Sequence, residues 1–222
     1  MGVNLSTVES SWSSGDVTTA IASAWIGGLV GEVASQASVY GSYATGEVTG
    51  GHYAGGLVGR SEGYVALSYS RGTVTDGQIC GGVVGRALEA EEGTEVFQVF
   101  SVTNVSSCPG AMAGVVGNLG GTLDEAYNVG YVQPGDFSNA IVQVITSTGT
   151  VVTDRVNWLT DNGAEFDLAC CRGAGAGDFA SAQTFGFSIH NPPETSNPES
   201  NWVMRSGQGA PVDERPVFTW MD

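Results

Sequence analysis

Short apolar stretches alternate with glycine along the first half of the chain. The motif Gly27-Gly28-Leu29-Val30-Gly31 recurs at residues 55–59 and 81–85, and again at 113–117 with alanine in first place. No stretch keeps a helical period, and one such unit is too short to bury its own Leu and Val side chains, whereas stacked units can. The pattern therefore predicts an all-β fold, a parallel β-helix-like β-solenoid. Its inward-pointing row would be Leu29, Leu57, Val83 and Val115.

A second motif is interleaved with the first. Residues 42–49 match residues 68–75, with a leading copy at 11–18 and degenerate copies at 100–106 and 127–133. Its aromatic position predicts a row that packs rather than a ligand platform: Trp12, Tyr43, Tyr69, Phe100 and Tyr127. Its last hydroxyl position predicts a second row on an exposed face: Thr18, Thr49, Thr75 and Ser106. The neighbours of this row are mixed and acidic, which disfavours a flat ice-binding array: Asp16, Glu47, Thr73 and Asn104.

The repeat fades from about Pro134. Residues 141–145 and 150–153 read as strands of an irregular last coil or hairpin. Aromatic residues then gather near the end, and an open solenoid end needs a cover, so we expect a hydrophobic plug there. The sequence thus predicts one continuous domain, with repeats over residues 1–133 and an irregular last coil and aromatic C-terminal capping segment over residues 134–222. The capping aromatics are Phe185, Phe187, Trp202, Phe218 and Trp220.

These motifs resemble the GLUG repeat of bacterial and archaeal surface proteins, which include adhesin-like proteins and non-catalytic regions of immunoglobulin-A-cleaving metallopeptidases. The resemblance covers about residues 10 to 133 and is weakest at Ala113, where the repeat has glycine. It implies a stalk or adhesive scaffold, and it supplies no catalytic residue to carry over.

Charge narrows the choice of partner. The chain has 23 acidic residues against 7 basic ones, for a net charge of −16. Such an acidic chain is unsuited to nucleic acid, because phosphate needs a basic face. No apolar run reaches the roughly 18 residues of a membrane helix, so no membrane insertion is expected. No signal peptide is visible after Met1, and we expect a fragment or mature chain of an extracellular or cell-surface protein.

Four cysteines predict disulfides in an exported chain, with three possible pairings. Cys80 and Cys108 occupy equivalent regions of neighbouring repeats, which favours a bridge across adjacent coils. Cys170 and Cys171 could form a vicinal disulfide or pair elsewhere. Their spacing fits no zinc site.

Catalytic signals are weak. His52 and His190 are isolated, and neither a His-Glu-x-x-His motif nor a Gly-x-Ser-x-Gly elbow occurs. The acidic run 89–92 with Glu95 reads as a solvated loop that could bind calcium weakly, and no other cofactor is expected. The favoured interpretation is a non-catalytic module that contacts glycan, protein or neighbouring subunits. Two alternatives remain open: a carbohydrate-active β-helix enzyme, and an ice-binding solenoid that uses the hydroxyl row.

Overall fold

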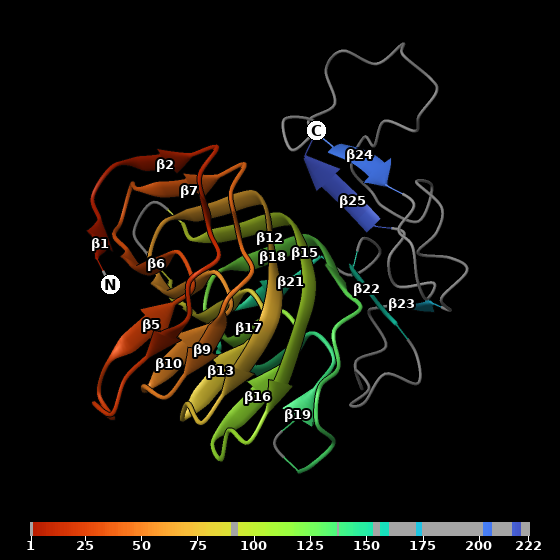
Figure 1. Cartoon of the computed structure of the whole chain (residues 1–222). Coiled ribbons are helices and arrows are strands. Elements are labelled where there is room, and N and C mark those ends of the chain that lie inside the picture. The colour runs from red at the N-terminus through yellow and green to blue at the C-terminus, as the bar shows by residue number, and fades with distance from the viewer. Residues whose placement is uncertain are drawn as a thin grey trace.

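The predicted solenoid is present in a computed structural model of the chain. The structure describes residues 2–89, 93–136 and 138–152, together with the backbone of strands at 156–159, 172–174, 202–205 and 215–218. These residues form an all-β parallel β-solenoid of about five turns (Figure 1). The described part of the chain contains no helix, and therefore none that could cross a membrane.

Two parallel sheets carry the glycine-rich motif, one on each side of it. The strands before the motif pair in the order β19 (Ser138–Asn139), β16 (Ala111–Ala113), β13 (Ile79–Gly81), β10 (Tyr53–Gly55) and β5 (Trp25–Gly27). The strands that follow it pair in the order β1 (Val3–Asn4), β6 (Val30–Val33), β11 (Val58–Ser61), β14 (Val84–Ala87), β17 (Val116–Leu119) and β20 (Val142–Ile145).

The third parallel sheet carries the aromatic motif and closes the other side of each coil. Its main path is β2 (Thr7–Glu9), β7 (Ser38–Tyr40), β12 (Tyr64–Thr75), β15 (Glu95–Ser106), β18 (Thr122–Asn128), β22 (Val156–Leu159) and β23 (Arg172–Ala174). Shorter strands complete its arcs: β3 (Trp12–Ser13), β4 (Val17–Thr18), β8 (Tyr43–Ala44), β9 (Glu47–Thr49) and β21 (Thr150–Val151). Separately, β24 (Trp202–Arg205) and β25 (Arg215–Phe218) pair antiparallel.

The inward row lies where the repeats place it. The backbone N–H of Leu29 donates to the carbonyl of Leu57 at 3.0 Å, and Leu57 donates to Val83 in the same way. The series continues through Val115 to Ile141, each bond being 3.0 Å. Leu57, Val83 and Val115 are fully buried, and Leu29 in the first coil is partly buried against the same core. The prediction of stacked apolar rungs is therefore confirmed.

The coil that follows residue 133 is parallel. Val142 pairs with Val116 and Ser138 with Met112, so β19 and β20 continue the two glycine-motif sheets in register. The segment at 141–145 therefore forms a further coil, one of the two forms that the sequence left open, and not a hairpin. Apart from the backbone of β24 and β25, the predicted cap at residues 185–220 lies outside the described residues.

The motif glycines bring the two sides of the coil together. A Cβ on Gly56 would lie 2.1 Å from the carbonyl oxygen of Gly82 in the next coil and 2.9 Å from the Ser70 Cβ across the interior. This narrow waist divides the interior into two apolar clusters. The hydroxyl of Ser70 donates to the Gly82 carbonyl at 2.6 Å, and Thr103 donates to Ser70 at 2.8 Å, so these buried hydroxyls form hydrogen bonds within the waist.

The coil corners do not use the glycines of the Gly-Gly motif. Glycine permits either positive φ or close backbone approach, and the motif glycines serve close approach. A left-handed φ of about 47° to 56° occurs instead at one rung of the third sheet, in five successive coils. Its residues vary in type: Ser10, Gly41, Leu67, Gln98 and Glu125. The bend is thus imposed by coil stacking and not by a glycine preference.

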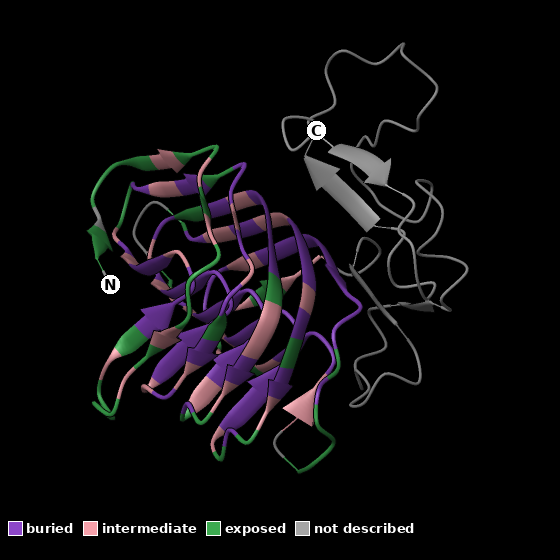
Figure 2. Ribbon diagram, viewed as in Figure 1, coloured by how far each residue is buried: buried purple, intermediate pink, exposed green. Residues whose placement is uncertain are grey.

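Burial increases inward from the N-terminal end. Figure 2 shows exposed and intermediate residues over the first coil, whereas the strands of the following coils are mainly buried. Large apolar side chains exposed in the first coil include Val3, Leu5, Trp12 and Ile21. This coil has a neighbour on one side only, so its apolar rungs are half covered.

Candidate functional site

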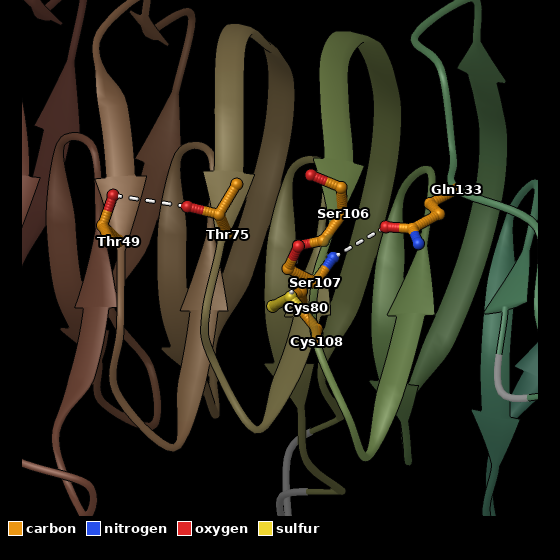
Figure 3. The surroundings of a disulfide bond; sticks show 7 residues. All are labelled: Thr49, Thr75, Cys80, Ser106, Ser107, Cys108 and Gln133. Atoms are coloured by element: carbon orange, nitrogen blue, oxygen red, sulfur yellow. Dashed lines mark hydrogen bonds between the residues drawn. A yellow bond between two sulfur atoms is a disulfide. The ribbon is translucent and has the colours of Figure 1, made fainter.

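The hydroxyl row of the repeats lies in register on the third sheet. Thr18 pairs with Thr49, Thr49 with Thr75, and Thr75 with Ser106. The Oγ1 atoms of Thr49 and Thr75 are 3.4 Å apart, and Figure 3 shows the row crossing successive coils. Thr18 is exposed and the other three residues are half-buried. The alignment of the row follows the repeat, while its role in binding stays a prediction.

The row next to these hydroxyls is uneven in size and charge. Glu47 aligns with Thr73, and Thr73 with Asn104. Several of its side chains bond to the backbone of the adjacent coil: Asp16 accepts from the N–H of Glu47 at 2.8 Å, and Asn104 accepts from the N–H of Tyr131 at 3.0 Å. These contacts tie coils together, so this row is occupied by structural hydrogen bonds rather than being a flat array for a regular ligand.

The aromatic row forms a continuous column. Tyr43 and Tyr69 stack with ring centroids 4.9 Å apart and planes 2° apart, and Trp12 stacks on Tyr43 at 6.0 Å. Tyr69, Phe100 and Tyr127 are almost fully buried. Burial also raises the pKa of the Tyr43 hydroxyl above its ordinary value. The column therefore packs the coils, and Trp12 is its one strongly exposed member.

One disulfide joins adjacent coils. Cys80 in β13 bonds to Cys108, which follows β15, and both cysteines are buried in the smaller apolar cluster. Figure 3 places the bond beside Ser106 and Ser107, at the end of the hydroxyl row. The bridge across neighbouring repeats is thus present, while Cys170 and Cys171 lie outside the described residues.

Removing this disulfide should weaken the solenoid. The bond closes a loop with a sequence separation of 28 residues, so it restricts the unfolded chain substantially. The double variant Cys80→Ala/Cys108→Ala is expected to lose about 2–4 kcal/mol of unfolding free energy, measured by urea denaturation. The unaltered protein and the variant both keep Cys170 and Cys171, so the difference in unfolding free energy comes from Cys80 and Cys108 alone. An unchanged urea midpoint would show that the pair does not constrain the chain.

The strongest concentration of binding chemistry lies on the outer face of the two glycine-motif sheets. Two arginines of successive coils, Arg60 and Arg86, each reach over an aromatic ring. The guanidinium carbon of Arg60 lies 4.3 Å from the Trp25 ring centroid, and that of Arg86 lies 5.0 Å from the Tyr53 centroid. His52 contacts Tyr53 edge-on at 4.4 Å. We call these five residues the arginine–aromatic surface.

This surface borders a hollow of about 570 Å³. Besides the five residues, Ala22 and Ser23 line it. A second hollow of about 570 Å³ shares Ala22 and His52 with the first, and is also lined by Thr49, Asp76 and Gln78. The two hollows therefore adjoin at Ala22 and His52, and we call the pair the valley. It runs from the hydroxyl row, around the corner of the coils, to the arginines.

The two arginines differ in their electrostatic surroundings. Arg60 forms ion pairs with Glu32 and Glu62, so its charge is compensated. Arg86 has no carboxylate partner among the described residues; its Nη1 donates to the Tyr53 hydroxyl at 2.5 Å, and its Nε is buried without an acceptor. Among the described residues, no carboxylate therefore balances the positive charge of Arg86 at the border of the hollow.

The repeat register contains a signal for this surface that the sequence interpretation did not use. Arg60 and Arg86 each directly follow the last glycine of the motif, and Trp25 and Tyr53 each stand two residues before its first glycine. Tyr53 pairs with Trp25 and Arg86 with Arg60, so equal spacing in the sequence becomes stacking in space. Aligning the motif copies would have placed all four residues on one face.

The other candidate sites give little further chemistry. Residues 90–92 of the acidic run and His190 lie outside the described residues, whereas Glu89 is exposed and Glu95 half-buried. Within the described ranges, no three His, Cys, Asp or Glu side chains are grouped to hold a metal ion. The calcium hypothesis for this run stays a prediction.

Comparison of the chain with protein families, with curated proteins and with solved structures finds no match.

Proposed function

We propose that this chain is a non-catalytic structural or adhesive module of an extracellular surface protein. It presents a rigid β-solenoid whose outer faces contact glycan, protein or another copy of the chain. The similarity of its two motifs to GLUG repeats supports this role. The observation that carries the proposal is the arginine–aromatic surface, where side chains of successive coils repeat along one face of a scaffold held in register.

Rigidity is what makes such a surface suitable for binding. The coils are joined by parallel ladders on three sides, by buried hydroxyl bonds at the waist and by the Cys80–Cys108 disulfide. Side chains on this framework lose little backbone freedom on contact, which favours association. The disulfide also favours an oxidising compartment, in agreement with an extracellular location.

Glycan-array binding with the oxidised protein tests this function. We expect retention on a subset of glycans with no change in the mass of the bound sugars after long incubation. Gly15→Ala, whose new Cβ meets no atom within 4 Å, should bind like the unaltered protein and serves as the control for handling. Release of reducing sugars would instead favour the carbohydrate-active enzyme, and thermal hysteresis lost in Thr49→Leu would favour the ice-binding solenoid.

A further inference from the structure

We infer that the hollow beside Arg86 binds the carboxylate of an acidic saccharide, with the sugar chain lying along the valley between the arginine–aromatic surface and the hydroxyl row. The inference deepens the proposed adhesive function and rests on it.

The positive charge of Arg86 favours an anionic ligand. Of the arginine side chains that the structure describes, Arg60 is paired with two carboxylates and Arg71 is exposed on β12, away from this hollow. Arg86 donates once, to a neutral phenol, and keeps its guanidinium charge without a counter-ion among the described residues. A ligand carboxylate can accept two parallel N–H bonds from a guanidinium, and such bonds are about twice as strong as neutral ones.

The contact with Tyr53 fixes the guanidinium for this role. Its Nη1 donates to the Tyr53 hydroxyl, its guanidinium carbon lies 5.0 Å from the Tyr53 ring centroid, and its Nε lies buried. The remaining donors are on the terminal nitrogens, which are the ones able to meet a ligand. An arginine already positioned in this way loses less side-chain entropy on binding than a free one.

The rest of the lining points to a sugar. Trp25 is 37% exposed and His52 is half-buried, and both ring side chains line the hollow, where the C–H groups of a pyranose can pack against them. Farther along the valley, the Asp76 carboxylate can accept hydrogen bonds from sugar hydroxyl groups, and the Gln78 amide can donate or accept them. Two joined hollows of about 570 Å³ each suit an oligosaccharide better than a small ion.

The overall charge limits which anion fits. A chain with net charge −16 repels a densely charged polyanion, and a single uncompensated arginine cannot offset that repulsion. A short saccharide carries only a few carboxylates and needs only one such contact. This favours short uronic-acid oligosaccharides over long sulfated or phosphorylated polymers.

The probes are galacturonic acid oligomers and their fully methyl-esterified counterparts, with binding measured by calorimetry. We expect the acidic oligomer to bind at least about tenfold more tightly than the ester, because the ester cannot form the charge-assisted bonds. Arg86→Gln should weaken binding of the acid about tenfold to a hundredfold and leave binding of the ester almost unchanged. Arg86→Lys keeps the positive charge but loses the paired N–H donors of the guanidinium. Its affinity for the acidic oligomer should lie between those of the unaltered protein and Arg86→Gln.

Arg71→Gln is the matched control, since it makes the same change in net charge outside the hollow. It should bind the acidic oligomer like the unaltered protein. Equal loss of oligomer binding in Arg71→Gln and Arg86→Gln would overturn the inference. Displacement of the acidic oligomer by inorganic phosphate, at a concentration at which phosphate binds a free guanidinium, would also overturn it. Urea midpoints measured on each variant separate loss of binding from loss of folding. Glycan-array retention that survives Arg86→Gln would remove this site and leave the adhesive function intact.

Discussion

Replacing Gly56 with alanine is expected to lower the free energy of unfolding by about 4 kcal/mol or more, which places it among the most severe single substitutions. The new Cβ would meet the carbonyl oxygen of Gly82 at 2.1 Å and the Ser70 Cβ at 2.9 Å. The nearer atom is backbone, so no side-chain rotation relieves the contact. The coil must separate from its neighbour or widen at the waist, which breaks the hydrogen bond between Ser70 and Gly82.

Gly15→Ala is the control for this experiment. A Cβ added to Gly15, in the first coil, would have open space around it, with no atom within 4 Å. Alanine there should therefore change stability by no more than about 0.5 kcal/mol. Urea denaturation followed by tryptophan fluorescence and far-ultraviolet circular dichroism measures both variants. If Gly56→Ala and Gly15→Ala unfold at the same urea concentration, the close approach at the waist does not hold.

Leu57→Ala is expected to cost about 3–5 kcal/mol. Leu57 is fully buried in the second coil, with Leu29 on one side and Val83 on the other. Removing its side chain loses the transfer free energy of the deleted carbons and leaves a cavity between two rungs that backbone bonds keep apart. Because neighbouring coils share this core, the loss should also weaken the coils on either side.

Leu5→Ala removes the same atoms from an exposed position. Leu5 is 79% exposed in the first coil, so the change should lie within about 0.5 kcal/mol. Chemical denaturation gives the energies, and hydrogen exchange of the amides in β6, β11 and β14 shows whether protection falls together in the three coils. A cost for Leu57→Ala no greater than that for Leu5→Ala would contradict a shared interior.

Several features of the candidate site could be predicted from the sequence. The hydroxyl row at Thr49 and Thr75 and the aromatic column at Tyr43 and Tyr69 follow from motif copies, because equal positions in a solenoid stack. The Cys80–Cys108 bridge follows from the same rule. These predictions succeed because each depends only on which residues share a rung.

The repeat register alone was not sufficient to predict the charge of the arginine–aromatic surface. Arg60 and Arg86 occupy the same rung, yet in the described part of the chain Arg60 pairs with Glu32 and Glu62 while Arg86 pairs with no carboxylate. That difference depends on the conformations in which the long Arg and Glu side chains reach across neighbouring coils. The repeat places a residue on a face and leaves open which neighbour it contacts.

The sequence by itself determined the all-β solenoid, the inward row from Leu29 to Val115 and the stacking of like residues, because its repeat dictates which backbone segments pair. The tertiary structure decided where the coil bends, with Leu67 and Gln98 in left-handed conformations that their residue types do not favour. It also decided that the motif glycines serve close approach and that Arg86 has no carboxylate partner among the described residues. The physical reason is that pairing is a local property of the repeat, whereas bending, clearance and charge compensation depend on contacts between coils.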